Sequence, residues 1–127
     1  LLDRIDLHLS LPEVSWSELD GARSGESSAA LRRRVADVRQ RQIARQGCLN
    51  AKLPGAALGR LARPTPAAKR LLERSMDGFG LSARAVHRAL RVARTIADLA
   101  GEDCVEKDSI GEALSLRSEI GEAQNGV

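Results

Sequence analysis

Arg84 stands two residues after Ser82, where the sequence predicts the start of a helix. A serine in that position caps the free N–H groups of the first turn, and the N-terminus of a helix has a partial positive charge. The arginine adds a full positive charge at the same end, so a phosphate or another anion is favoured there. A solvated arginine on the polar face of an amphipathic helix explains the same residues, and spacing alone does not separate the two interpretations.

The six residues 78–83 (Gly-Phe-Gly-Leu-Ser-Ala) match the GxGxxA pattern of dinucleotide-binding loops, and Asp98 follows 20 residues after Gly78. Such a loop needs a strand before the glycines and a second strand bearing the acid. Here a predicted helix precedes the glycines, and Asp98 lies inside another predicted helix. We therefore expect the glycines to end one helix and to form a tight turn.

Several catalytic motifs are missing from the sequence. No segment matches GxxxxGK[ST] or GxSxG, and no apolar run ends in paired acids, so the chain by itself is not expected to hydrolyse a nucleotide. Cys48 and Cys104 lie far apart, and with His8 and His87 they make no zinc-finger spacing, so no metal site is predicted. Two separate thiols and no export signal are typical of a cytoplasmic protein.

Charge is segregated along the chain. The net charge is +3, but residues 1–22 contribute −4, residues 23–94 contribute +13 and residues 95–127 contribute −6. A segment this basic is typical of a surface that faces a polyanion, which makes these arginines candidates for DNA phosphate contacts: Arg32, Arg33, Arg34, Arg39, Arg41 and Arg45. Aromatic residues make up only 2% of the chain, too few for a reader that stacks single-stranded bases.

Helical periodicity dominates the elements that must position these groups. It predicts helices over residues 27–47, 54–61, 66–76, 83–100 and 107–116, with a frayed tail at 121–127. In the first helix, one narrow apolar stripe is expected to face inward: Leu31, Val35, Val38 and Gln42. The predicted fold is a small all-α bundle of four to five helices.

The beginning of the chain has a different pattern. Apolar and polar residues alternate from Ile5 to Leu11 and then meet Pro12, which predicts a single strand. One strand has no partner in an otherwise helical chain, so the segment either belongs to a sheet outside this chain or is disordered. We expect residues 1–25 to be largely mobile, and the chain to be part of a longer protein.

Three stretches are familiar: LLDRIDLHLSLP from residue 1, GESSAALRRRVADVRQRQIARQG from residue 25, and LLERSMDGFGLSARAVHRALRVARTIADLAGEDCVEKDSIGEAL from residue 71. Together they resemble the C-terminal portion of the magnesium-chelatase-like AAA+ ATPases, in their ComM-like competence branch, over about residues 1–117. The resemblance implies three parts. Residues 1–26 end the ATPase core and form a linker, residues 27–120 are a helical insertion followed by the lid, and residues 121–127 are a flexible tail.

The resemblance also implies roles for two arginines. Arg84, in the sequence Leu-Ser-Ala-Arg, matches the sensor-2 arginine that contacts the γ-phosphate of ATP, within one subunit or between two. Arg4 matches the arginine finger that is presented to the nucleotide of a neighbouring subunit. Both roles fit a reaction that is catalysed mainly by positioning and by positive charge.

For the full-length parent, the resemblance implies ATP and Mg²⁺ as cofactors, neighbouring subunits of a hexameric ring as partners, and DNA as the substrate of a motor in natural transformation. The fragment alone is expected to be monomeric, to bind no cofactor and to be inactive as an ATPase. Two alternatives remain open: a helical module that binds DNA directly, and the lid of a magnesium-chelatase subunit.

Overall fold

The computed structural model describes residues 5–13, 15–16 and 25–125. This part of the chain contains five α-helices and one short 3₁₀ turn: α2 (Ser28–Gln46), η2 (Asn50–Lys52), α3 (Gly55–Leu61), α4 (Pro66–Phe79), α5 (Ala83–Leu99) and α6 (Lys107–Asn125). Within it there is no β-strand, only an isolated bridge between Pro64 and Val105. The prediction of an all-α bundle is therefore confirmed.

The helices begin where local capping groups stand. The hydroxyls of Ser27, Thr65 and Ser82 accept hydrogen bonds from N–H groups in the first turns of α2, α4 and α5, at 3.1, 3.2 and 3.1 Å. These bonds satisfy donors that a helix start otherwise leaves unpaired. At the other end, α4 stops at Phe79 because Gly80 has a left-handed φ of 65°. Gly80 thus ends the helix, as expected, whereas Gly78 lies inside α4.

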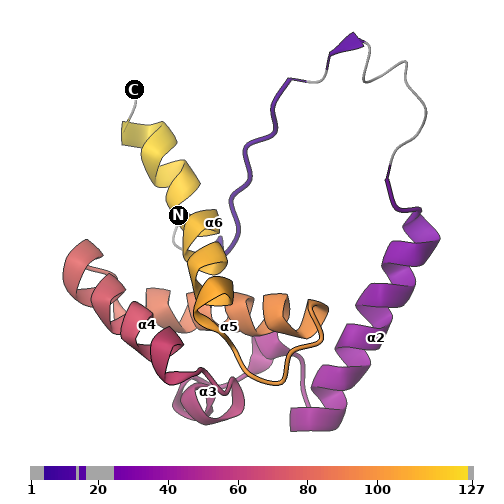
Figure 1. Ribbon diagram of the computed structural model, residues 1–127, viewed down its shortest axis with the longest axis horizontal. Helices are drawn as coiled ribbons and strands as arrows, with labels where there is room; N and C mark the ends of the chain where they lie inside the picture. The colour runs from indigo at the N-terminus through magenta and orange to yellow at the C-terminus, as the bar shows by residue number, and fades with distance from the viewer. Residues whose placement is uncertain (1–4, 14, 17–24, 126–127) are drawn as a thin grey trace.

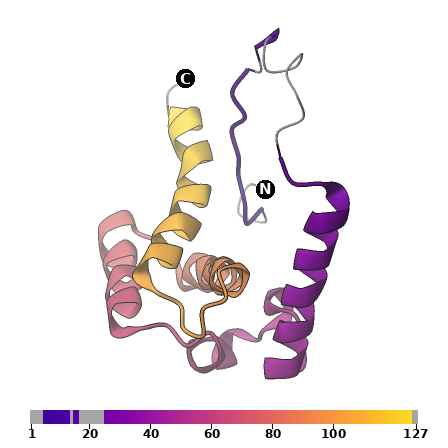
Figure 2. The same cartoon turned by 45° about the vertical axis from the view of Figure 1, so that its right-hand side comes forward.

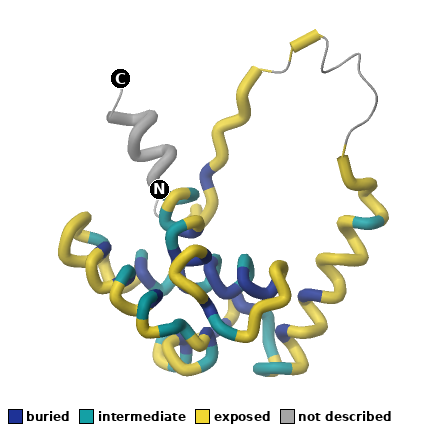
Figure 3. Tube along the Cα trace, in the orientation of Figure 1, coloured by how far each residue is buried: buried dark blue, intermediate teal, exposed yellow. Residues whose placement is uncertain are grey.

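Helix α5 is the centre of the bundle, with α3, α4 and α6 packed against it and α2 standing to one side (Figure 1). Buried residues gather along α5 and along the faces turned toward it (Figure 3). The core consists of Leu53, Leu58, Ala62, Ala68, Leu72, Val86, Leu90, Ala93, Ala97, Val105, Ile110 and Ala113. Removing this apolar surface from water, at about 25 cal/mol per Å², holds the bundle together.

One predicted helix end is wrong. Helix α4 ends at Phe79, beside the glycines expected to end it, whereas α6 continues to Asn125 instead of Leu116. In α6 the glycine at position 121 does not stop the helix, because each further residue adds a backbone hydrogen bond once the helix has formed. An interior glycine costs only about 1 kcal/mol relative to alanine. None of the described helices is long and apolar enough to cross a membrane.

The alternating segment at the beginning of the chain does not form a strand in its described part, residues 5–13. It runs as extended chain beside α6, where the His8 N–H donates to the carbonyl oxygen of Leu116 at 3.1 Å. His8, on the polar face of the alternation, is buried, while Leu7 and Leu9 on the apolar face are exposed. We expected residues 1–25 to be largely mobile. Part of that range, residues 1–4, 14 and 17–24, lies outside the described residues.

The predicted apolar stripe of α2 is only half buried. Val38 and Gln42 are buried, but Leu31 and Val35 are 40% and 47% exposed. The reason is the placement of the helix: its second half approaches α5 and η2, and its first half stands clear of the bundle (Figure 2). The N-terminal half of the stripe therefore extends beyond the surface of the bundle against which its C-terminal half packs.

Candidate functional site

Arg84 lies in the first turn of α5 and is exposed. Ser82 caps this turn through a 3.1 Å hydrogen bond from the Ala85 N–H. Among the described residues Arg84 forms no ion pair, so its guanidinium is not neutralised by a carboxylate there. A free positive side chain beside the positive end of a helix is an arrangement that attracts anions.

A cavity of about 100 Å³ adjoins Arg84. It is lined by Ser82, Arg84, Ala85, Arg88 and Arg117, and we call it the arginine pocket. Three of its five lining residues are cationic, and its wall includes the start of α5. Since a water molecule occupies about 30 Å³, the pocket has room for a group of the size of a phosphoryl group but not for a whole nucleoside.

The other two arginines of this pocket come from different places. Arg88 follows Arg84 by one turn of α5, and its Nε lies 3.2 Å from Asp6 Oδ1, with the side chain 16% exposed. Arg117 comes from α6, and its Nη1 is buried without a hydrogen-bond partner among the described residues. The structure thus brings a residue of the 5–13 segment and a residue of α6 to the N-terminal end of α5.

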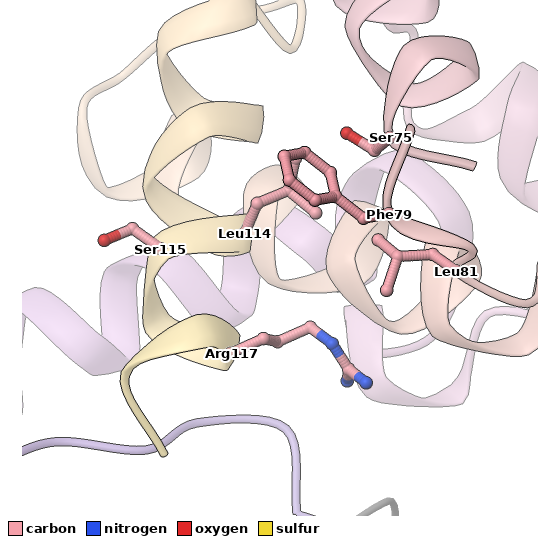
Figure 4. Close-up of a pocket in the computed structure, with 6 residues that line it drawn as sticks. All are labelled: Ser75, Phe79, Leu81, Leu114, Ser115 and Arg117. Atoms are coloured by element: carbon pink, nitrogen blue, oxygen red, sulfur yellow. The ribbon is translucent and has the colours of Figure 1, made fainter. Parts of the chain in front are cut away.

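Arg117 also borders a larger apolar hollow of about 350 Å³, which lies between α4, the turn before α5, and α6. Figure 4 shows the Phe79 ring directed toward Leu114, with Arg117 extending from α6 past Leu81. Phe79 is 83% exposed, so the hollow is open to one side. Arg117 lines both this apolar hollow and the arginine pocket.

A buried polar cluster lies at the other end of α5. Asp98 is 1% exposed and accepts hydrogen bonds from Arg45 Nη1 at 2.7 Å, Asn50 Nδ2 at 2.9 Å and Arg94 Nε at 3.1 Å. Burial by itself raises the pKa of Asp98, but the hydrogen bonds from Arg45 and Asn50 and the charges of Arg94 and Arg45 outweigh it, so the pKa lies below its usual value. Asp98 is therefore a stable carboxylate at neutral pH.

Arg94 is the fully buried partner in this cluster, with 0% exposure. It donates to the backbone carbonyls of Ala62, Asp103 and Glu102 at 3.1, 2.8 and 2.6 Å. Burial lowers the pKa of Arg94, opposed by Asp98, and an arginine stays protonated in any case. Because these contacts of Arg94 are internal, its role is to hold the end of α3 and the loop after α5 together.

This buried polar cluster was not predicted from the sequence. A signal was present, since Arg94 and Asp98 stand four residues apart on the helix face of Leu90, Ala93 and Ala97. A charged pair within an apolar face indicates a buried, hydrogen-bonded ion pair. Arg91, on the same helix, is half-buried and donates to the carbonyl oxygen of Leu53 at 3.1 and 2.9 Å.

The candidate DNA-contact arginines of α2 differ in their burial and in their bonding partners. Arg45 is bound to Asp98 and Asn50 and is half-buried. Arg41 is exposed and donates from Nη1 to the Asp98 carbonyl oxygen at 3.2 Å, and Arg34 pairs with Glu26 at 3.0 Å. The remaining three are exposed: Arg32, Arg33 and Arg39. Arg45 thus belongs to the internal cluster, and the other five face the outside.

Two further candidates concern other parts of the chain. Arg4 lies outside the described residues. Among the residues that are described, no group of three or more His, Cys, Asp or Glu side chains is placed to hold a metal ion, and Cys48 and Cys104 are free thiols.

Comparison with known proteins gives consistent matches. The chain is 38% identical over 120 residues to the "Competence protein ComM" of Haemophilus influenzae, covering 94% of this chain and 24% of that protein. It is 40% and 38% identical over 118 residues to uncharacterised proteins named YifB from Salmonella typhimurium and Escherichia coli, covering 92% of this chain and 23% of each. The chain thus spans about a quarter of the length of these relatives.

A family model, described as "Magnesium chelatase, subunit ChlI C-terminal", matches residues 25–117. This range begins just before α2 and ends within α6, so it covers the whole helical core, the buried polar cluster and the arginine pocket except for Asp6 beside it. The match extends over well more than half of the chain, and the chain therefore belongs to the family of magnesium chelatase ChlI C-terminal domains.

Proposed function

We propose that this chain is the lid of a ComM-like AAA+ ATPase and that Arg84 is its sensor-2 arginine, which contacts the terminal phosphate of ATP. The observation that supports this is the state of Arg84: it is exposed in the capped first turn of α5, without an ion pair to any described residue, beside a cationic cavity. An arginine that was neutralised internally would be unsuited to this role.

The chemistry needs little more from this chain than a placed positive charge. Transfer of the terminal phosphoryl group is catalysed mainly by positioning and by stabilising the charge on its oxygens. ATP with Mg²⁺ would supply the phosphoryl group, held by segments of the parent that this chain lacks. Arg84 would bind one terminal oxygen, and the N-terminus of α5 would favour the same negative charge.

The same proposal places the lid between subunits of a ring. Arg4 would serve as the arginine finger toward a neighbouring subunit, a role that rests on the resemblance of its sequence context. The exposed apolar residues Leu31 and Val35, on the half of α2 that stands clear, would then pack against the rest of the parent or a neighbouring subunit. Exposed apolar stripes of this kind are typical of interaction surfaces.

The test uses the full-length parent. Arg84→Ala should lower kcat for ATP hydrolysis about 10²-fold or more, as expected when a donor to the developing charge is removed. The melting temperature should stay unchanged because Arg84 is exposed. Arg70→Ala, on the exposed face of α4, is the matched control and should leave hydrolysis unaffected. Normal hydrolysis by Arg84→Ala would show that the sensor assignment is wrong.

A second candidate function is direct DNA binding by α2, because five arginines of this helix face outward. Five phosphate contacts would make log affinity fall with log salt at a slope of about −4.5. A titration of duplex DNA with this chain at increasing salt measures that slope. Absence of binding at about 50 mM salt would dispose of this function. Neither test depends on whether the parent acts on DNA or, like a magnesium chelatase, on a porphyrin.

A further inference from the structure

We propose that Arg88 and Arg117 complete a phosphate site with Arg84, and that Asp6 competes with the phosphate for Arg88. The ligand is the terminal phosphoryl group of a polyphosphate chain. The proposal deepens the sensor role of Arg84, on which it rests, by adding two arginines and one regulating carboxylate that no comparison assigns. Under this proposal, binding of a nucleotide changes how residues 5–13 are attached to α5.

The first support is the position of Arg88, which separates two cavities. On one side it lines the arginine pocket with Arg84 and Arg117. On the other side it lines a second cavity with Asp6, Ala51, Arg91, Val92 and Thr95, and there its Nε pairs with Asp6. Arg88 thus pairs with a carboxylate beside one cavity and lines the other cavity with two further arginines, so it has two alternative sets of partners.

The second support is Arg117. Its Nη1 is buried and has no hydrogen-bond partner among the described residues. A buried guanidinium N–H that remains unpaired is costly, and an arginine has donors only, so the partner must be an acceptor. In the arginine pocket the other lining side chains are two more arginines, a serine and an alanine. A phosphate oxygen entering the pocket would satisfy this donor.

The third support is the charge of the pocket. Three guanidinium groups lining one small cavity repel one another, and the only carboxylate paired with any of them in the described part of the chain is Asp6. Asp6 is 49% exposed and lines the second cavity, not the arginine pocket. A phosphoryl group with two or more negative charges offsets this repulsion, and guanidinium groups bind phosphate oxygens through charge-assisted hydrogen bonds.

The consequence concerns the segment of residues 5–13. Its described attachments to the bundle include the Asp6–Arg88 ion pair and the hydrogen bond from the His8 N–H to Leu116. Leu116 directly precedes Arg117, so both attachments adjoin arginines of the pocket. When Arg88 turns to a phosphate, Asp6 loses this ion pair, while the hydrogen bond from the His8 N–H to Leu116 remains. Phosphate binding would therefore loosen this segment.

The test is an NMR titration of the 127-residue chain with sodium tripolyphosphate, without metal. The Nε–Hε signals of Arg84, Arg88 and Arg117 should shift together, and the amide signals of Asp6 and Leu7 should shift with them. Arg88→Gln and Arg117→Gln should each weaken the affinity about tenfold or more, as expected for a lost hydrogen bond to a charged group. Arg70→Gln has the same change of charge on α4 and should leave the affinity unchanged.

Asp6→Asn is the decisive variant for the competition. It frees Arg88 from a partly exposed ion pair, so tripolyphosphate should bind about two- to fivefold more tightly than to the wild-type chain. Unchanged or weaker binding by Asp6→Asn would overturn the competition. Arg88→Lys, which keeps the charge but loses the fork of donors, should bind with intermediate affinity. A dispersed amide spectrum of each variant shows that it has folded.

The remaining outcomes distinguish this inference from the function on which it rests. If the wild-type chain binds no tripolyphosphate, or if only Arg84→Gln weakens binding, the three-arginine site is wrong while the sensor role of Arg84 stands. If Arg88→Gln and Arg117→Gln weaken binding but Arg84→Gln does not, the phosphate site stands and the sensor assignment is wrong. Equal affinity for orthophosphate and tripolyphosphate would overturn the assignment to a polyphosphate end.

Discussion

Arg45 Nη1 donates a hydrogen bond to Asp98 Oδ1 at 2.7 Å, although 53 residues separate the two in the sequence. Arg45 stands in the last turn of α2, and Asp98 lies near the end of α5. The first half of α2 contributes little apolar burial, since Leu31 and Val35 are exposed. The attachment of α2 to the bundle therefore depends to a large extent on this buried polar cluster.

Asp98→Asn should destabilise the chain by about 3 kcal/mol or more, because it leaves Arg94 buried without a counter-charge. Equilibrium unfolding in urea, followed by circular dichroism, measures the loss. Asp77→Asn removes the same charge from an exposed position of α4 and should change the free energy of unfolding by no more than about 0.5 kcal/mol. Equal effects of the two substitutions would mean that the cluster does not stabilise the fold.

The stabilising effect of Asp98 should depend on pH in a defined direction. Its pKa is lowered in the folded chain, so its contribution is complete above the unfolded value of about 3.9 and is lost as the pH falls from there through the folded pKa. The difference in unfolding free energy between wild type and Asp98→Asn should therefore be constant near neutral pH and shrink below about pH 4. A difference that stays the same down to pH 2 would contradict the lowered pKa.

Arg45→Met should loosen α2 without unfolding the bundle. The loss of hydrogen bonds to a charged partner costs about 1.5–3 kcal/mol, and this falls on the attachment of α2 because Arg94 and Asn50 still bind Asp98. Amide hydrogen exchange in α2 should accelerate at least about tenfold, while amides of α5 remain protected. Arg39→Met, at an exposed position of the same helix, is the control and should not change exchange. Equal acceleration in all helices would refute a local role.

Gly55 and Gly59 should respond oppositely to alanine, although both lie in α3. A Cβ at Gly55 would stand 2.9 Å from His87 Nδ1, whereas nothing lies within 4 Å of a Cβ at Gly59. Gly55→Ala should therefore destabilise the chain by about 1–3 kcal/mol, and Gly59→Ala should stabilise it by up to about 1 kcal/mol. In the His87→Ala background the penalty at Gly55 should disappear. Its persistence there would rule out the close approach to His87 as the cause.

The sequence by itself determined where the helices begin. Ser27, Thr65 and Ser82 cap N–H groups only three residues away, so the signal and its structural effect lie within one turn. It also placed Arg84 in the first turn of α5, because that position follows directly from the cap. Local hydrogen bonds do not depend on the rest of the chain, which is why these predictions needed no tertiary information.

Only the tertiary structure decided which arginines are internal and which face outward. In the sequence, Arg45 belongs to the same basic helix as Arg39, yet Arg45 binds the buried Asp98 and Arg39 stays exposed. Arg88 meets Asp6 in an ion pair and Arg117 in the arginine pocket, which joins residues from three distant segments. A charged side chain finds its partner through the packing of whole helices, and periodicity along one helix contains no information about that packing.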